Sequence, residues 1–259
     1  MTISHLDRLL PPDGKIVVVA IDHPLYSWPC RGLEDRVATV RTVVDAGADA
    51  LIASYGTLRD LADDIAPARR ILKLDLTTVA LNAYPLTPYR IAWTLDDAVR
   101  LGVDAVLTYV QVGGPEELEA LTGAASVAAA ADAAGLPFVC ESMPVESERF
   151  PNARDAIAIA AATRTAVELG AHMVKTTMPD PAEGIAQSTA FGVPVITAGG
   201  DPTDRERWLE DVNRARIAGA AGVAFGRNVW GAPDPGSVVR ELSAAVHGRA
   251  LGIDTGPVG

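Results

Sequence analysis

A short apolar run of strand type and a helical segment alternate eight times along this chain of 259 residues. Runs of β-branched residues favour strands, and apolar residues spaced three and four apart favour helices. The expected strands cover residues 16–22, 50–54, 71–74, 105–112, 138–142, 171–176, 193–198 and 222–226. The expected helices cover residues 34–46, 58–65, 96–101, 115–134, 153–169, 181–190, 204–218 and 234–247. Eight such units are the number in a TIM barrel, so we predict an α/β chain with the (β/α)8 fold.

A similar three-residue motif recurs where several helices end and the next strand begins. Gly-Ala-Asp starts at Gly47, Gly-Val-Asp at Gly102 and Gly-Ala-His at Gly170. Glycine accepts the left-handed backbone that ends a helix, so the repeated step indicates one repeated architecture. An open doubly wound sheet is the alternative, but no Gly-x-Gly-x-x-Gly follows the first strand. We therefore expect a single barrel domain over residues 1–251 and a flexible tail over 252–259.

Composition narrows the choice of partners. The net charge is −11, which argues against nucleic acid or an anionic membrane as a partner but permits a small anionic substrate. The chain shows neither a signal-peptide pattern at its start nor an uncharged apolar run of about 18 residues. Two cysteines in no framework spacing suggest a reducing compartment. We expect a soluble, cytoplasmic protein that forms a homo-oligomer.

One lysine stands in a position where apolar residues are the rule. Lys175 lies near the end of the apolar run 171–176, and Pro179 then breaks the strand. Strands of a parallel barrel are buried on both faces, so such a lysine either reaches an edge or is held away from water. Burial disfavours the ammonium form and frees the amine to attack a carbonyl group. We predict that Lys175 forms a Schiff base.

Other ionisable residues are expected at the same end of the barrel. Asp22 ends the first strand, Lys73 lies in the third and Glu141 in the fifth. Each alone is equally well explained by an ion pair that fills the barrel, but several together favour an active site, which this fold builds at the carboxyl ends of its strands. Asp22 and Glu141 are candidate proton relays. Lys73 is a candidate for keeping the Lys175 amine neutral or for binding an anionic substrate group.

The loops after the last two strands carry glycines. Gly199-Gly200 follows the seventh strand and Gly226-Arg227 follows the eighth, where this fold commonly binds phosphate. We predict a phosphate site there, with tight turns as the alternative explanation of the glycines. His23 is a further candidate substrate contact or proton relay, with a structural role as the alternative. The sequence contains no His/Asp/Glu cluster in metal-ligand spacing, so neither a metal ion nor a cofactor is expected.

Taken in order, these motifs resemble the DeoC/LacD-type class I aldolases from about residue 16 to residue 247. The resemblance is carried by Ala-Ile-Asp22-His23, Leu-Lys73-Leu, Gly-Leu-Pro-Phe-Val-Cys-Glu141, Gly-Ala-His-Met-Val-Lys175, Thr-Ala-Gly199-Gly200 and Gly226-Arg227-Asn228-Val-Trp. It implies a Schiff-base lysine at Lys175, an acid at Asp22, and a phosphate held by Gly199, Gly200, Gly226 and Arg227.

The chain departs from that family at two positions. Met143 stands where the archaeal-type fructose-bisphosphate aldolases have a proton-relaying tyrosine, so a proton-transfer role falls to another group, with Glu141 as the best candidate. A glutamate on this strand is closer to the tagatose-bisphosphate branch. Pro24 replaces the glycine that usually follows Asp-His, which alters the first loop.

The expected activity is that of a class I aldolase. Such an enzyme would cleave or form a carbon–carbon bond of a phosphorylated ketose or a close analogue through an imine on Lys175. Two alternatives stay open at this stage. One is a transaldolase-like synthase that uses the same imine, and the other is a phosphate-ligand-binding barrel that has lost catalysis.

Overall fold

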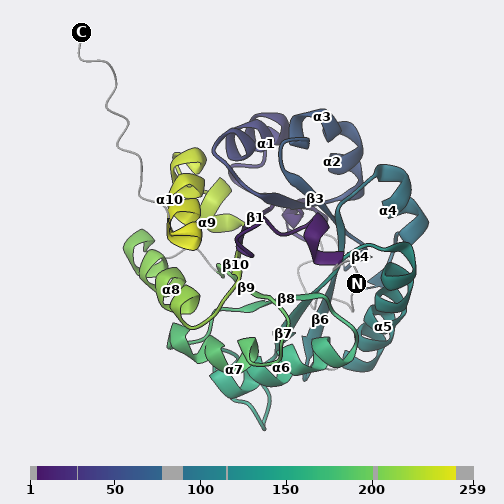
Figure 1. The fold of residues 1–259 in the computed structure, drawn as a ribbon, viewed down its shortest axis with the longest axis vertical. Coiled ribbons are helices and arrows are strands. Elements are labelled where there is room, and N and C mark those ends of the chain that lie inside the picture. Colours follow the sequence, from purple (N-terminus) through teal and green to yellow (C-terminus); the bar gives the residue numbers. More distant parts are fainter. Residues whose placement is uncertain (1–4, 28, 78–89, 115, 201–203, 249–259) are drawn as a thin grey trace.

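Eight parallel strands close into a barrel in the computed structural model, which describes residues 5–27, 29–77, 90–114, 116–200 and 204–248 (Figure 1). The barrel strands are β1 (Ile16–Ala20), β2 (Ala50–Ala53), β3 (Arg69–Lys73), β6 (Ala105–Val112), β7 (Phe138–Pro144), β8 (Met173–Thr177), β9 (Val195–Ala198) and β10 (Gly222–Phe225). Each pairs in parallel with its neighbours, and β1 closes the ring by pairing with β10 as well as with β2. The predicted (β/α)8 fold is confirmed.

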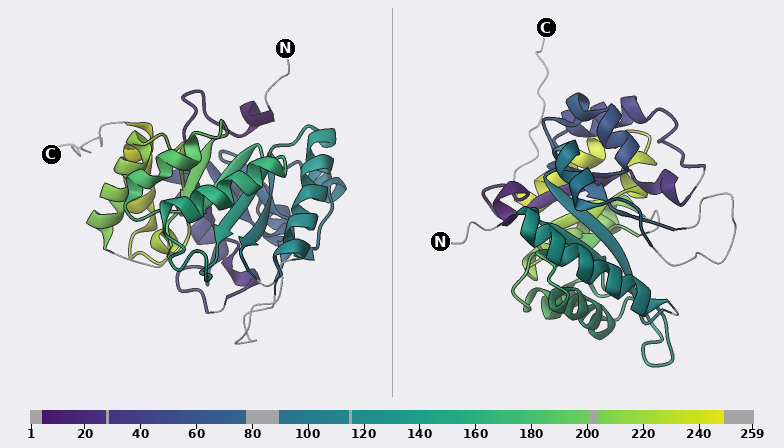
Figure 2. Two further views of the ribbon diagram at one scale, coloured as in Figure 1. Left: turned by 90° about the horizontal axis from the view of Figure 1, so that it is seen from below. Right: turned by 90° about the vertical axis from the view of Figure 1, so that its right-hand side faces the viewer.

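The helices form a ring around the outside of the barrel (Figures 1 and 2). They are α1 (Arg36–Asp45), α2 (Tyr55–Asp60), α3 (Ala62–Ile65), α4 (Leu95–Leu101), α5 (Glu117–Ala134), α6 (Ala156–Glu168), α7 (Ala186–Thr189), α8 (Arg205–Ile217), α9 (Arg227–Trp230) and α10 (Pro235–His247). Short 3-10 helices cover η1 (His5–Arg8), η2 (His23–Leu25) and η3 (Ala182–Ile185). Two expected helices are each divided, the segment 58–65 between α2 and α3 and the segment 181–190 between η3 and α7.

Polar side chains fix several helix starts. The side chain of Thr94 accepts a hydrogen bond from the backbone N–H of Asp97, and Asp97 bonds back to Thr94 in a capping box. Asp155 accepts a bond from the N–H of Ile157 at the start of α6. Gly102 ends α4 in the left-handed conformation, with φ of 63°, as its place in the repeated step predicts.

Three short elements were not expected from the sequence. β4 (Asp75–Leu76) and β5 (Arg90–Ile91) pair antiparallel beside the third barrel strand, in a region expected to be a loop. The short helix α9 begins directly at Arg227, where only a loop was expected. The predicted flexible tail over residues 252–259 lies outside the described residues.

The repeated Gly-x-Asp/His motif also supplies hydrogen-bond acceptors to the barrel strands. Its polar residue accepts a hydrogen bond from a backbone N–H near the start of the neighbouring strand. Asp49 accepts from Val17 at 2.7 Å, Asp104 from Arg70 at 2.8 Å, and the ring nitrogen Nδ1 of His172 from Phe138 at 3.1 Å. These bonds satisfy strand N–H groups at the amino-terminal edge of the barrel, which the sheet itself leaves without an acceptor.

The barrel interior is apolar up to the level of the ionisable side chains. Inward-facing residues such as Val18, Ile52, Val139 and Met173 belong to one buried cluster, which Leu9 joins from the segment after η1. Because side chains alternate across a strand, the next inward positions above Val139 and Met173 are Glu141 and Lys175. The interior is therefore a packed core that ends in a polar layer at the carboxyl ends of the strands.

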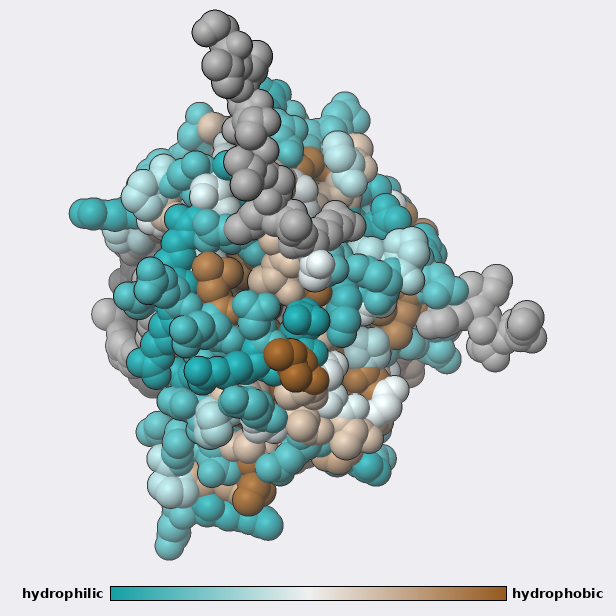
Figure 3. Space-filling model, turned by 60° about the vertical axis from the view of Figure 1, so that its left-hand side comes forward, coloured by the Kyte–Doolittle hydropathy of each residue, from teal (hydrophilic) through white to brown (hydrophobic). Residues whose placement is uncertain are grey.

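The outer surface of the molecule is largely hydrophilic on the side that Figure 3 shows. Hydrophobic side chains are scattered over that side. The apolar faces of the helices pack against the barrel instead, in a second buried cluster. Among the described helices, none combines the length and the hydropathy needed to cross a bilayer.

We expect Asp104→Ala to lower the free energy of unfolding by about 1–2 kcal/mol, because the Arg70 N–H loses its acceptor. Urea unfolding followed by tryptophan fluorescence measures this change. Asp45→Ala is the matched control, since Asp45 lies exposed at the end of α1 and should change stability by less than about 0.5 kcal/mol. Equal effects of the two substitutions would contradict a role for Asp104 at the strand edge.

Candidate active site

Lys175 and Glu141 form a buried ion pair at the mouth of the barrel. They face each other across the β7–β8 ladder, where Glu141 is in register with Lys175. Lys175 Nζ lies 2.6 Å from Glu141 Oε1, and the two side chains are only 6% and 10% exposed. The carboxylate of Glu141 is therefore within proton-transfer distance of the Lys175 amine.

A second lysine–carboxylate pair lies in the same polar layer. Lys73 Nζ is 2.6 Å from Asp75 Oδ1, and both side chains are almost fully buried. Asp75 was not among the predicted site residues, because it lies just beyond the expected strand 71–74. The signal was present in the alternation Lys73-Leu74-Asp75, which puts the two polar side chains on one face of an extended segment.

Asp22 lies just beyond β1 and is 3% exposed. Burial acts to raise the pKa of its carboxyl group, but His23 and the charges of Lys73 and Lys175 outweigh it and lower the pKa to about 2. The structure thus brings Asp22, Lys73 and Lys175 close enough to act on one another electrostatically. Asp22 is an ionised carboxylate at any physiological pH.

His23 is held by packing next to this carboxylate. Its Nδ1 atom lies 3.7 Å from Asp22 Oδ1, which is beyond hydrogen-bond distance. Its ring contacts those of Tyr26 and Trp230, with centroids 5.1 and 5.2 Å away. The indole N–H of Trp230 in turn donates to the carbonyl of Ala20 at the end of β1. These contacts pack His23 at the rim of the barrel.

Tyr109 and Met143 complete the inner wall beside Glu141. Tyr109 is in register with Glu141 on β6, and Lys73 Nζ lies 5.6 Å from the centre of its ring. Burial, together with the charge of Glu141, raises the pKa of Tyr109 to about 12, so its hydroxyl stays protonated. Met143 occupies the next inward position above Glu141, and its sulfur accepts a hydrogen bond from Thr177 Oγ1 at 3.1 Å.

The two glycine-containing loops lie next to each other after β9 and β10. The side-chain amide of Asn228 donates to the carbonyl of Gly199 at 3.0 Å, and this hydrogen bond links the two loops. A Cβ atom on Gly199 would come within 2.9 Å of the Phe225 ring, and one on Gly226 within 2.7 Å of His23. Close packing therefore requires glycine at both positions, independently of any ligand. Arg227 follows at the start of α9 and is half-buried.

Three metal-ligand-type side chains gather at the opposite, amino-terminal end of the barrel, although their spacing in the sequence gave no sign of it. Ligand atoms of His5, Asp132 and His172 all lie within 4.8 Å of one another. However, Nδ1 of His172 accepts a hydrogen bond from the backbone N–H of Phe138. A neutral imidazole in that state carries its proton on Nε2, the atom that faces Asp132, so this nitrogen has no free electron pair for a metal ion.

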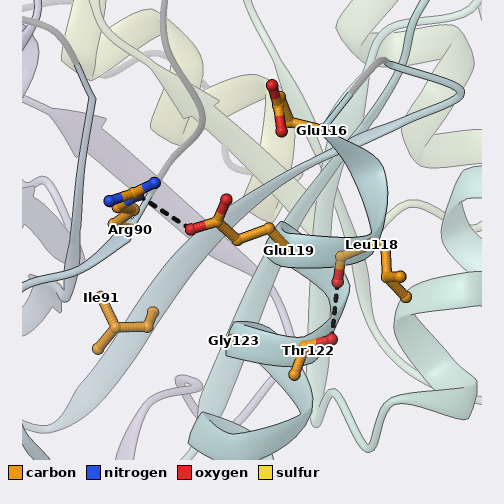
Figure 4. Close-up of a pocket in the computed structure, with 7 residues that line it drawn as sticks. All are labelled: Arg90, Ile91, Glu116, Leu118, Glu119, Thr122 and Gly123. Carbon is orange, nitrogen blue, oxygen red and sulfur yellow. Dashed lines mark hydrogen bonds and ion pairs between the residues drawn. The ribbon is translucent and has the colours of Figure 1, made fainter.

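A groove of about 620 Å³ lies outside the barrel, between β5 and the first turns of α5 (Figure 4). It is lined by Arg90, Ile91, Glu116, Leu118, Glu119, Thr122 and Gly123. Arg90 is paired with Glu119 across it at 2.9 Å, and Thr122 donates to the carbonyl of Leu118. The groove holds none of the inward-facing lysines and is separate from the polar layer in the barrel mouth.

The sequence profile of the DeoC/LacD family aldolases matches residues 16–232, which include all eight strands of the barrel. The chain belongs to this family. It is accordingly an aldehyde-lyase-type enzyme, and this sets aside the interpretation as a barrel without catalysis.

Two relatives carry the names of synthases. The chain is 34% identical to 2-amino-3,7-dideoxy-D-threo-hept-6-ulosonate synthase of Halobacterium salinarum over 248 residues, covering 95% of this chain and 92% of that protein. It is 31% identical to 2-amino-4,5-dihydroxy-6-oxo-7-(phosphonooxy)heptanoate synthase of Streptomyces griseus, covering 91% and 86%.

The structure of a Schiff-base-forming fructose-1,6-bisphosphate aldolase is similar throughout, with a TM-score of 0.84 at 27% identity. The similarity covers 93% of this DeoC/LacD family member and 98% of that protein.

The lowered pKa of Asp22 predicts a specific pH dependence of stability. Its pKa of about 2 lies below the ordinary 3.8, so the ionised form stabilises the folded state above about pH 4, and this contribution is lost as the pH falls toward 2. The difference in unfolding free energy between wild type and Asp22→Asn should be constant near neutral pH and shrink by about 2 kcal/mol over that interval. Urea unfolding at a series of pH values tests this, and a difference that does not change with pH would contradict it.

Proposed function

We propose that this aldolase cleaves or forms a carbon–carbon bond of a phosphorylated ketose, or a close analogue, through a Schiff base on Lys175. The observation that supports this best is the 2.6 Å contact between Lys175 and Glu141 in the water-poor mouth of the barrel. A nucleophilic amine needs an adjacent group that takes and returns protons, and this pair supplies both parts. The similarity to a Schiff-base-forming aldolase supports the same chemistry.

The pair can carry the reaction without further proton-transfer groups. Glu141 takes a proton from the Lys175 ammonium, and the amine attacks the ketone carbon of the substrate. The ketone oxygen receives that proton back from Glu141, which then moves a second proton from the nitrogen to the carbinolamine hydroxyl, so that water leaves and an iminium ion remains. The iminium then accepts the electron pair of the breaking carbon–carbon bond, while Glu141 takes the proton of the hydroxyl group that becomes an aldehyde. Cleavage leaves an enamine on Lys175, Glu141 returns the proton to its carbon, and water hydrolyses the resulting iminium, which releases the second fragment and the free lysine. The reverse sequence forms the bond.

Asp22 takes a different role from Glu141 in this proposal. A carboxylate with a pKa of about 2 is a weak base, so it accepts a proton poorly near neutral pH. It is instead suited to accept hydrogen bonds from substrate hydroxyls and to stabilise the positive charge of the iminium ion. Glu141 is therefore the proton-transfer group, in the place where the family resemblance leaves Met143 without that ability.

The phosphate group of the substrate is proposed to bind at Gly199, Gly200, Gly226 and Arg227. Glycines let backbone N–H groups approach an anion closely, and a guanidinium group adds a charge-assisted hydrogen bond. The bond from Asn228 to Gly199 holds the two loops together, which favours a site that is formed before the ligand arrives. His23 lines the same rim and supports Gly226 by contact.

Borohydride trapping tests the assignment of Lys175. Wild-type protein incubated with dihydroxyacetone phosphate or fructose 1,6-bisphosphate and then reduced should carry a stable adduct on the peptide that contains Lys175, seen by mass spectrometry. Lys175→Ala should carry none and should lose at least about a thousandfold in kcat, because the covalent intermediate cannot form. If several phosphorylated ketoses leave the wild-type lysine unmodified, the proposal is wrong.

A synthase that transfers a ketol unit through the same imine is the second candidate. It is favoured by the two relatives whose names describe synthases. Adding a second aldehyde as acceptor to the enzyme and its ketose phosphate distinguishes the two functions. A synthase should yield the new condensation product faster than it releases free dihydroxyacetone phosphate, whereas a simple aldolase should release both cleavage fragments whether or not the acceptor is present.

A further inference from the structure

Two lysines with similar surroundings lie in the mouth of the barrel. Lys73 on β3 and Lys175 on β8 are both inward-facing, both nearly buried, and each 2.6 Å from one carboxylate. A neutral amine at either position would be chemically able to condense with a ketone. What differs between them is how the partner carboxylate is held.

The carboxylate of Asp75 contacts a different group with each of its oxygens, through an ion pair on one and a hydrogen bond on the other. Oδ1 contacts Lys73 Nζ, and Oδ2 accepts a hydrogen bond from the backbone N–H of Tyr109 in the barrel strand β6. The side chain is 1% exposed, so it has no room to move away from Lys73. The ring of Tyr109 lies 5.6 Å from the same ammonium group and also favours its charged form.

The carboxylate of Glu141 is held less firmly. Its side chain is 10% exposed, and apart from Lys175 no hydrogen-bond or ion-pair partner is found for it within the described parts of the chain. Its longer side chain leaves one oxygen available to substrate and water. Glu141 can therefore give and take protons, whereas Asp75 is bound to a fixed neighbour.

The charges around Lys73 also stabilise its ammonium form. Burial alone would lower the pKa of its ammonium group, but the charges of Asp75, Asp22 and Glu141 outweigh burial and raise the pKa above the ordinary value. Its fixed positive charge contributes in turn to the low pKa of Asp22.

We propose that Asp75 is a positioning residue that holds Lys73 as an ammonium ion and thereby confines imine formation to Lys175. This inference rests on the proposed Schiff-base function. An ammonium nitrogen has no free electron pair, so it cannot attack the ketone carbon, and the sequence of carbinolamine formation, loss of water and iminium formation cannot begin on Lys73. Asp75 thus decides which of two lysines is the nucleophile without touching the substrate.

Borohydride trapping in double variants tests this directly. Dihydroxyacetone phosphate is the probe, and the modified lysine is located by peptide mass spectrometry. The wild type should be modified on Lys175 only, and Lys175→Ala on neither lysine. Adding Asp75→Asn to Lys175→Ala should create an adduct on Lys73. Its amount should be at least about tenfold above the background signal of the single variant, since a fall of even one unit in the pKa of Lys73 raises the neutral fraction of its amine tenfold.

Lys175→Ala combined with Glu141→Gln is the matched control. It also removes a carboxylate near Lys73 but keeps Asp75, so Lys73 should stay unmodified. An adduct on Lys73 while Asp75 is intact, or none in a folded Lys175→Ala, Asp75→Asn protein, overturns the inference while leaving the Lys175 chemistry standing. A wild type without an adduct on Lys175 overturns the proposed function and this inference together.

A second measurement covers the case in which the Asp75→Asn double variant does not fold. The Lys175→Ala protein is then trapped at increasing pH. We expect no adduct on Lys73 up to about pH 10.4, where an ordinary lysine is half neutral. An adduct on Lys73 at or below that pH would overturn the inference.

Discussion

The contact between Lys175 and Glu141 is the interaction on which the proposed chemistry of this protein depends. Two opposite charges inside a barrel lose most of their hydration, and only a short, well-aligned contact offsets that cost. The parallel ladder between β7 and β8 supplies the alignment, because it sets the two residues in register. The same burial that makes the pair costly keeps water away from an imine, which water would hydrolyse.

The pair lies inside the barrel because every second side chain of a barrel strand points inward. Val139 and Met173 point inward and belong to the apolar interior, and two residues further along each strand the side chains become Glu141 and Lys175. Lys73 follows Ile71 by the same rule on β3. The active end of the barrel is therefore the point where inward positions change from apolar to ionisable, and the apolar layers below hold the strands at the spacing that the ion pairs need.

Much of this arrangement could be predicted from the sequence. The alternation of strand and helix patterns was strong enough to give the barrel, because each unit carries its own periodicity and its own turn. Lys175, Glu141, Lys73 and Asp22 were identified since a charged residue at the end of an apolar strand is unusual, and the structure brings all four to one end.

What could not be predicted depends on contacts between segments distant in sequence. The bond from the Tyr109 N–H to Asp75 joins residues of different strands, so the local alternation Lys73-Leu74-Asp75 gave the direction of the side chain but not the partner that holds it. The hydrogen bonds at the amino-terminal edge of the barrel likewise join residues more than thirty positions apart. In these bonds, strand N–H groups donate to Asp49, Asp104 and His172. The gathering of His5 with His172 appears only once the chain closes on itself.

A crystal structure of the enzyme trapped with a phosphorylated ketose would be the decisive measurement. The chemistry described here predicts continuous electron density from Lys175 Nζ to the former ketone carbon, Glu141 within hydrogen-bond distance of that nitrogen or of the reacting oxygen, and the phosphate at Gly199, Gly200 and Gly226. A ligand bound in the barrel mouth with its ketone remote from Lys175, or joined to any other side chain, would contradict it.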